Sequence, residues 1–223
     1  MSGAYTVKAA IFDMDGLLID SEPLWDLAEL DVIRELGLNI SLQDPMLDTL
    51  GLRIDLVVDL WYHHAPWTSP SRQQVVQQII ERALTLVEQR RPLLPGVEQA
   101  LQLCRELKLK VGLASASPLF MLERVLEIFH LRDYFDVLVS AEHLPYSKPH
   151  PEVYLQAAEK LGVNPLECVT LEDSLNGVIA TKAARMRSIV VPQAELRDDA
   201  RWSLANRKLG SLLELQSADL LGR

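Results

Sequence analysis

The segment AAIFDMDGLLIDS, residues 9–21, begins with four apolar residues that run directly into two aspartates one residue apart. A continuous apolar run of this length predicts a strand buried on both faces, as in a parallel sheet. Residues two apart in an extended chain point the same way, so the side chains of Asp13 and Asp15 reach the same place. Ligands of open α/β sheets bind at this end of the strands, and the segment therefore predicts a site there.

Two carboxylates at such close quarters repel each other, and either a shared proton or a divalent cation offsets the repulsion. Hard oxygen ligands favour Mg²⁺. Taken alone, however, the Asp-Gly step of this segment is more typical of a plain turn. The choice between a turn and a functional site depends on what stands at the ends of the other strands.

Four more short apolar runs lack the alternation of a half-exposed strand, and each predicts a strand buried on both faces. Helical patterns separate them, and strands that alternate with helices indicate a doubly wound parallel sheet. The four runs are VGLAS (111–115), VLVS (137–140), CVTLE (168–172) and SIVVP (188–192). The predicted fold class is therefore α/β.

The region from residue 21 to residue 90 breaks this alternation. It contains three helical patterns and no strand-like run, which predicts an all-helical insert after the first strand. The predicted domains are a core of residues 1–20 and 91–223 and a helical domain of residues 21–90. The polar tail after residue 192 is expected to hold a short edge strand and a final helix.

Composition limits the partners and the cellular location that fit this chain. The chain has 223 residues and a net charge of −9, which disfavours nucleic acid and anionic membranes as partners. A small phosphorylated substrate is still compatible, because a local cation can reverse the field. The two cysteines lie far apart in sequence, and no apolar stretch approaches the ~20 residues of a membrane span. We expect a soluble, cytoplasmic protein and, by default, a monomer.

Polar residues follow three other predicted strands. Ser115 ends one of them, Lys148 stands between a strand-like run and a helix that opens with prolines, and Glu172 and Asp173 end another. Singly, a serine is typical of a helix cap, a lysine of a solvated surface and an acidic pair of a helix start. Because they stand at the ends of different strands, together they favour a site.

With these residues in place, the sequence resembles the haloacid dehalogenase superfamily, in its branch of phosphohydrolases with an α-helical cap, over nearly its whole length. The first motif, DxDGxLxDS, is matched by Asp13, Asp15, Gly16, Leu18, Asp20 and Ser21, and the later motifs by Ser115, Lys148 and Glu172-Asp173. Stretches such as FDMDGLLIDSEPLW and GLASASP are most similar to bacterial sugar-phosphate phosphatases. The resemblance implies a Rossmann-like core and a helical cap that closes over the site.

The resemblance also implies a mechanism. Asp13 would be the nucleophile that forms an aspartyl-phosphate, and Asp15 would protonate the leaving oxygen and then deprotonate the attacking water. Mg²⁺, or Mn²⁺ or Co²⁺ in its place, would bind Asp13, the backbone carbonyl of Asp15 and Asp173. Glu172 would support the metal through water or through a neighbouring ligand.

Substrate binding is implied in the same way. Ser115 and the backbone N–H of Ala116 would hold the phosphoryl oxygens, and Lys148 would contact both Asp13 and the phosphate. The implied substrates are hexose and hexitol phosphates such as 2-deoxyglucose 6-phosphate, sorbitol 6-phosphate and mannitol 1-phosphate.

Cap residues are the candidates for choosing the leaving group. Relatives carry a cap arginine that reaches the substrate, so Arg53 is expected to bind it, although a solvated arginine is nearly as well supported. Three aromatic residues either line the sugar face of the site or pack in the core of the cap. They are Trp25, Trp61 and Tyr62. The neighbouring His63 and His64 are expected on the surface, because no ligand spacing supports a metal there.

The main rival function is that of a mutase, and two further functions fit the sequence less well. A β-phosphoglucomutase would use the same aspartates, but such mutases carry histidine where Trp25 stands. A dehalogenase lacks the second aspartate of the first motif, and a silent binding module has no need of the full set of motifs. One departure from the family concerns stability alone, since many relatives have glycine at the position of Arg185.

Overall fold

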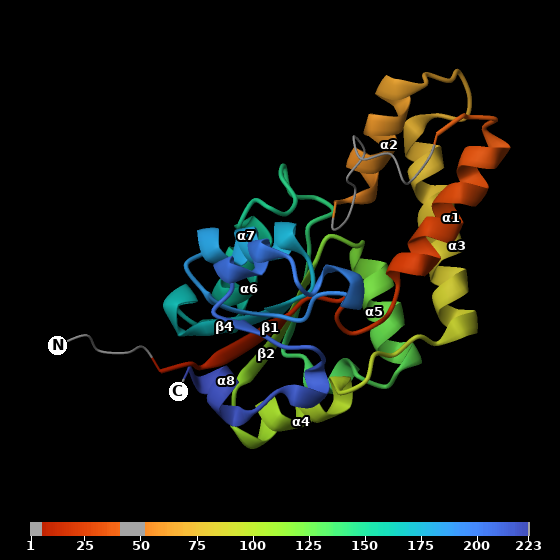
Figure 1. Ribbon diagram of the computed structural model, residues 1–223. Coiled ribbons are helices and arrows are strands. Elements are labelled where there is room, and N and C mark those ends of the chain that lie inside the picture. The colour runs from red at the N-terminus through yellow and green to blue at the C-terminus, as the bar shows by residue number, and fades with distance from the viewer. Residues whose placement is uncertain (1–5, 41–51, 223) are drawn as a thin grey trace.

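The computed structural model describes residues 6–40 and 52–222. Its centre is a six-stranded sheet in the order β3-β2-β1-β4-β5-β6, in which every neighbouring pair is parallel (Figure 1). The strands are β1 (Ala9–Phe12), β2 (Lys110–Ser115), β3 (Val137–Ser140), β4 (Cys168–Glu172), β5 (Arg187–Val190) and β6 (Arg207–Lys208). All five predicted strands are present, and the predicted α/β class is confirmed.

The first strand lies at the centre of the sheet, between β2 and β4. All four of its residues are fully buried, and alternate residues enter two separate apolar clusters. Phe12 joins the cluster that includes helices α4 (Val97–Glu106) and α5 (Leu119–Ile128), whereas Ile11 joins the cluster built on α6 (Glu152–Leu161). Burial on both faces explains why the strand is a continuous apolar run.

The register of the sheet brings three strand ends to one edge. Phe12 is aligned with Leu113 of β2 and with Leu171 of β4, and the N–H of Asp13 donates to the Leu171 carbonyl at 3.0 Å. The residues just beyond these strands therefore meet at the carboxyl edge of the sheet, where parallel α/β sheets bind their ligands.

Between β1 and α4, the described residues form helices and no strand. The helices are α1 (Glu22–Glu35), α2 (Ile54–His64) and α3 (Arg72–Arg90). Helix α3 packs against both others, and the three stand together as a group beside the sheet (Figure 1). The helical character of this region agrees with the sequence pattern, and the division into two domains at residues 20/21 and 90/91 stays a prediction.

The tail holds the predicted edge strand, β6, and a final helix, α8 (Ser217–Leu221). The remaining helical segments are α7 (Leu175–Ala183) and the short 3₁₀ turns η1 (Arg132–Tyr134), η2 (Pro165–Glu167), η3 (Ala194–Leu196), η4 (Ala200–Leu204) and η5 (Leu212–Glu214). Arg185 follows α7 with φ = +63°, a left-handed conformation that favours glycine.

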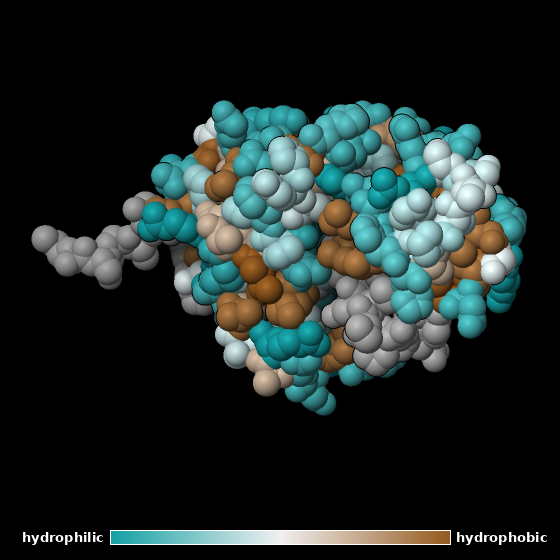
Figure 2. Space-filling view, turned by 90° about the horizontal axis from the view of Figure 1, so that it is seen from above, coloured by the Kyte–Doolittle hydropathy of each residue, from teal (hydrophilic) through white to brown (hydrophobic). Residues whose placement is uncertain are grey.

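The surface seen in Figure 2 is mainly hydrophilic, with hydrophobic residues gathered in small groups, in keeping with a chain of which 24% is charged. None of the helices in the described parts of the chain is both long enough and apolar enough to cross a membrane.

Candidate active site

Three acidic residues meet at the carboxyl edge of the sheet. Carboxylate oxygens of Asp13, Glu172 and Asp173 all lie within 4.8 Å of one another, and all three residues are buried. Lys148 lies among them, with its Nζ atom 2.8 Å from Oδ1 of Asp13 and 2.7 Å from Oε1 of Glu172. Four residues that the sequence placed after three different strands are therefore brought together by the parallel topology.

Gly16 makes this arrangement possible. Its φ is +71°, and a Cβ atom built on it would lie 2.0 Å from Oδ2 of Asp173. Its N–H donates to the carbonyl of Ile19 at 2.9 Å, which closes the turn that follows Asp15. The Asp-Gly step therefore forms a turn and also lies against the acidic cluster. Only glycine can adopt this φ and leave room for the carboxylate of Asp173.

The carboxylate of Asp15 lies outside the acidic trio, and four side-chain donors surround it. Oδ1 accepts hydrogen bonds from the Ser21 hydroxyl at 2.7 Å and from the Trp25 indole at 3.0 Å. Oδ2 accepts one from the Ser117 hydroxyl at 2.7 Å and a longer one from the Ser115 hydroxyl at 3.4 Å. Asp15 is therefore held in place through both of its carboxylate oxygens.

Glu172 is also enclosed by donors. Its Oε1 accepts hydrogen bonds from Lys148 at 2.7 Å and from the hydroxyl of Tyr154. Its Oε2 accepts from the backbone N–H of Asp173 at 3.3 Å and from the Ser174 hydroxyl at 3.2 Å. Because both oxygens are already engaged, Glu172 is better placed to hold Lys148 and the start of α7 than to serve as a free ligand.

Sequence reasoning missed two contributors to this arrangement. Tyr154 is fully buried on α6, and its ring centroid lies 5.0 Å from Nζ of Lys148. Gly177, in the first turn of α7, has no room for a Cβ, which would come within 2.0 Å of the carboxylate oxygens of Glu172. The sequence could have pointed to Tyr154, because a tyrosine on the apolar face of a helix needs a hydrogen-bond partner for its buried hydroxyl.

Burial dominates the electrostatics of the site. It raises the pKa of Asp13 to about 7, with further raising by Glu172 and Asp15 and an opposing effect of Lys148. Burial and the neighbouring Glu172 and Asp13 raise the pKa of Asp173 well above its ordinary value. Burial alone would lower the pKa of Lys148, but Asp13 and Glu172 reverse this, and the net direction is upward. The lysine therefore stays charged.

The site fits a divalent cation. One lysine faces three buried carboxylates, and within residues 6–40 and 52–222 no basic side chain forms an ion pair with Asp173. When its carboxyls are ionised, the acidic group thus carries more negative charge than Lys148 neutralises. Carboxylate and carbonyl oxygens are the ligands that Mg²⁺ prefers, so the donor set matches that ion.

Arg53 is largely shielded from solvent, and its partners are Asp55, Ala141 and Leu144, which lie outside the acidic trio. It stands directly before α2, its side chain is 14% exposed, and its guanidinium pairs with Asp55 at 2.6 Å. Its Nη1 also donates to the carbonyls of Ala141 and Leu144, at 2.6 and 2.8 Å, in the segment that follows β3. Arg53 therefore connects the start of α2 to the carboxyl edge of the sheet.

The three cap aromatics fall into different surroundings. Trp61 is fully buried in the apolar cluster, whereas Tyr62 packs edge-on against Trp67 with ring centroids 5.0 Å apart. Trp25 is the aromatic residue of the three that contacts Asp15. His63 and His64 are exposed, as expected. Ala116 directly follows Ser115, in the loop between β2 and α5.

Known proteins of similar sequence belong to the same family that the motif residues indicate. A family model described as a haloacid dehalogenase-like hydrolase matches residues 7–185. Hexitol phosphatase B of Escherichia coli O157:H7 is 67% identical over 222 residues, which cover 100% of both chains.

Two solved structures share the fold over almost the whole chain. CbbY from Rhodobacter sphaeroides in complex with phosphate has a TM-score of 0.83 and 27% identity, covering 96% of this chain and 99% of its own. A β-phosphoglucomutase from Clostridium difficile has a TM-score of 0.81 and 26% identity, covering 95% of this chain and 94% of its own. The family model, the full-length relative and the clustered motif residues agree, and the chain belongs to the haloacid dehalogenase-like hydrolases.

Proposed function

We propose that this enzyme, a phosphoric monoester hydrolase, is a Mg²⁺-dependent phosphatase of hexose and hexitol phosphates. The observation that carries the proposal is the pairing of the buried Asp13, in contact with Lys148, with a second carboxylate, Asp15, that is surrounded by donors. In this proposal Asp13 would attack phosphorus and Asp15 would move a proton. The name of the 67% identical relative, a hexitol phosphatase, supports the choice of substrates.

The proposed reaction has two steps. In the first, an oxygen of Asp13 attacks phosphorus, the bond from phosphorus to the sugar oxygen breaks, and Asp15 gives its proton to that oxygen. In the second, water attacks phosphorus, Asp15 takes the proton of the water, and inorganic phosphate leaves Asp13. Asp15 is ready for the next cycle because it has regained the proton that it gave.

Several residues would bind the metal and the phosphate and so offset the negative charge of the phosphate. Asp13, the carbonyl of Asp15 and Asp173 would hold Mg²⁺, which when bound neutralises the phosphate and the attacking carboxylate. Lys148 would contact the phosphate as well as Asp13. Ser115 and the N–H of Ala116 would hold the phosphoryl oxygens. Glu172 would keep Lys148 in place, an assignment that its own hydrogen bonds support.

The helices α1 to α3 would act as the cap, residues 21–90, over a core of residues 1–20 and 91–223. Arg53 would bind substrate from the cap, as related enzymes suggest. To do so, its guanidinium would exchange its contacts with the carbonyls of Ala141 and Leu144 for substrate oxygens. Closure of such a cap excludes water and completes the site.

We also propose that the protein works in the cytoplasm, as a monomer, on small phosphorylated molecules and not on nucleic acid or membranes. Both cysteines are free and buried, which suits a reducing compartment. The net charge of −9 disfavours polyanionic partners.

The test is release of inorganic phosphate from a panel of 2-deoxyglucose 6-phosphate, sorbitol 6-phosphate, mannitol 1-phosphate, glucose 6-phosphate and β-glucose 1-phosphate. Each substrate is assayed with Mg²⁺, with a chelator, and with Asp13→Asn. We expect release that requires the metal and falls more than ~10³-fold in the variant. Conversion of β-glucose 1-phosphate to glucose 6-phosphate without phosphate release would instead establish a mutase, the function named for the structural relative at 26% identity.

A further inference from the structure

We propose that Trp25 is a positioning residue for hydrolysis: its indole N–H holds Oδ1 of Asp15, so that Oδ2 exchanges the proton with the leaving oxygen. The inference rests on the proposed function, because it concerns Asp15 as the group that moves the proton. Its basis is geometric: the distance from Nε1 of Trp25 to Oδ1 of Asp15 is 3.0 Å.

The two donors on Oδ1 come from a single turn of one helix. The backbone N–H of Trp25 donates to the carbonyl of Ser21 at 2.9 Å, which places the two residues one turn apart at the start of α1. Their side chains converge on the same carboxylate oxygen, at 3.0 and 2.7 Å. Helix α1 therefore begins with a two-point contact to Asp15.

Helix α1 also lacks the usual side-chain hydrogen bond at its N-cap, because the Ser21 hydroxyl contacts Asp15. Ser21 occupies the N-cap position of α1, where a serine hydroxyl ordinarily accepts a backbone N–H of the first turn. Here the Ser21 side chain makes no such bond, and its hydroxyl donates to Asp15 instead. The Ser21 hydroxyl thus binds the Asp15 carboxylate and not the helix backbone. This points to a role for the first turn of α1 beyond helix stability.

The indole differs chemically from the three hydroxyls around Asp15. A serine hydroxyl can rotate and either donate or accept, whereas the indole Nε1–H can only donate. A proton on Oδ1 would face the hydrogen of Trp25, so the proton of Asp15 belongs on Oδ2. That oxygen lies beside Ser115 and Ser117, on the side of the site where the phosphoryl group is expected.

The proton transfer then balances without further groups. As the bond between phosphorus and the sugar oxygen breaks, the O–H bond at Oδ2 breaks and its proton forms the hydroxyl of the released sugar. In the second step, a proton of the attacking water returns to Oδ2. Through both proton transfers the Trp25 hydrogen bond stays on Oδ1, and the carboxylate keeps one orientation.

The test compares leaving groups in Trp25→Phe. The first-turnover release of the sugar is measured at saturating sorbitol 6-phosphate, and the release of p-nitrophenolate at saturating p-nitrophenyl phosphate. p-Nitrophenolate leaves without a proton, so the proposal predicts a loss of about tenfold or more for the sugar and less than about threefold for p-nitrophenolate. A role in lining the pocket would instead raise only the concentration of sugar phosphate needed for half the maximal rate.

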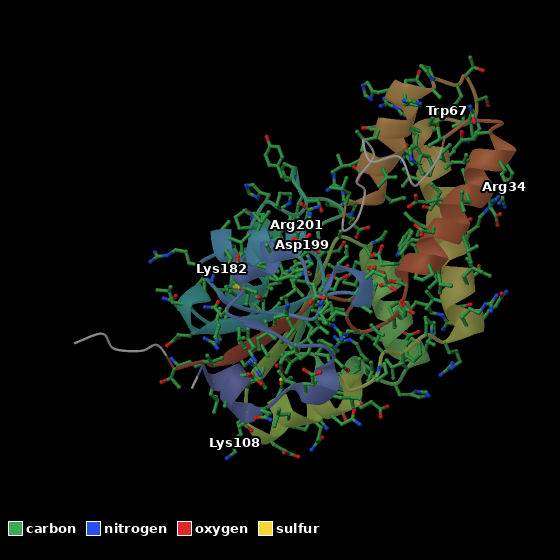
Figure 3. The ribbon with its side chains drawn as sticks, in the orientation of Figure 1. Arg34, Trp67, Lys108, Lys182, Asp199 and Arg201 are labelled. Atoms are coloured by element: carbon green, nitrogen blue, oxygen red, sulfur yellow. The ribbon has the colours of Figure 1, made fainter. Side chains whose placement is uncertain are left out.

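Two further variants complete the test. Trp67→Phe removes an indole that donates to the Pro70 carbonyl at 2.7 Å, far from the sheet (Figure 3), and should leave both rates unchanged. Trp25→His restores an N–H donor and should recover part of the lost sugar release, which keeps the proposal testable if the phenylalanine variant does not fold. Equal losses with both leaving groups, or no loss for the sugar, would overturn the proposal. A wild-type protein that releases no phosphate would overturn the proposed function instead.

Discussion

The ammonium of Lys148 lies 2.8 Å from Oδ1 of Asp13, and each of these side chains is at least nine-tenths shielded from solvent. The contact joins the end of β1 to the segment before α6, which are far apart in the sequence. Lys148 is also 2.7 Å from Glu172, so a single cation neutralises part of the charge of two buried carboxylates.

Replacing Lys148 by methionine is expected to lower phosphatase activity by about 10³-fold, because a preorganised charge at the reacting phosphate is lost. Lys182→Met is a matched control, since Lys182 is exposed and donates to Asn206 away from the acidic cluster (Figure 3). Initial rates at saturating substrate and Mg²⁺ measure the effect. Activity of Lys148→Met within a few-fold of the wild type would contradict the role of Lys148.

The metal-free protein should lose stability as the pH rises from about 4 to about 8. Burial raises the pKa of Asp13 to about 7, and burial followed by the nearby acids raises the pKa of Glu22 and of Glu29 to about 8. A carboxyl whose pKa is raised on folding stabilises the fold while protonated, and that contribution is lost as the pH passes its folded pKa.

Thermal melts in chelator across this pH range measure the effect. Asp13→Asn should melt above the wild type at pH 8 and approach it at pH 5, whereas Asp198→Asn, at an exposed site, should follow the wild type throughout. Added Mg²⁺ should restore the stability of the wild type at pH 8. A wild-type melting temperature that rises between pH 5 and pH 8 in chelator would contradict this account.

Gly16→Ala should weaken Mg²⁺ binding by about tenfold or more, because its Cβ would lie 2.0 Å from Oδ2 of Asp173 and displace that carboxylate. Gly37→Ala is the control for backbone strain alone. Gly37 has φ = +65° but nothing within 4 Å of a Cβ, so its replacement should cost about 1 kcal/mol of folding free energy and leave metal binding unchanged. Calorimetric titration with Mg²⁺ separates the two, and equal affinities for both variants would count against the assignment of Asp173.

Arg53→Ala should raise the KM for sugar phosphates by about tenfold, since a charge-assisted hydrogen bond to substrate contributes about 1.5 kcal/mol. Arg72→Ala removes another cap arginine, one that pairs with Asp59 at 2.6 Å on the exposed face, and should leave KM unchanged. Steady-state kinetics with sorbitol 6-phosphate distinguish them. If KM is unaltered in Arg53→Ala, the arginine serves only to join α2 to the segment after β3.

Arg185→Gly should raise the free energy of unfolding by about 0.5–1 kcal/mol, because Arg185 is exposed and holds φ = +63°. The neighbouring Ala183→Gly, within α7, should lower it by about the same amount. Urea denaturation measures both changes. A destabilised Arg185→Gly would mean that the arginine side chain makes a contribution larger than the backbone strain.

Much of the fold could be predicted because the relevant patterns are local. Continuous apolar runs such as that of β1 indicated buried parallel strands, and parallel strands necessarily bring their carboxyl ends to one edge. That is why Asp13, Lys148, Glu172 and Asp173 could be grouped in advance.

Other features depend on tertiary contacts that spacing does not reveal. The partner of Trp25 is set by the angle at which α1 leaves the turn, and the contacts of Arg53 join residues 88 and 91 positions apart in the chain. Whether Trp61 lined the site or packed in the cap core depended on the packing of α2 against α3, which no periodicity distinguishes. The roles of Tyr154 and Gly177 follow from the position of the Glu172 carboxylate alone.

The most direct measurement is to identify the residue that carries the phosphoryl group during turnover. The wild-type protein is mixed with Mg²⁺ and sorbitol 6-phosphate, quenched in acid within the first turnover, digested and analysed by mass spectrometry. The account predicts one phosphoryl group on the peptide that contains residues 9–21, located at Asp13 and missing from Asp13→Asn. Turnover with no phosphorylated peptide, or with the group on another residue, would contradict it.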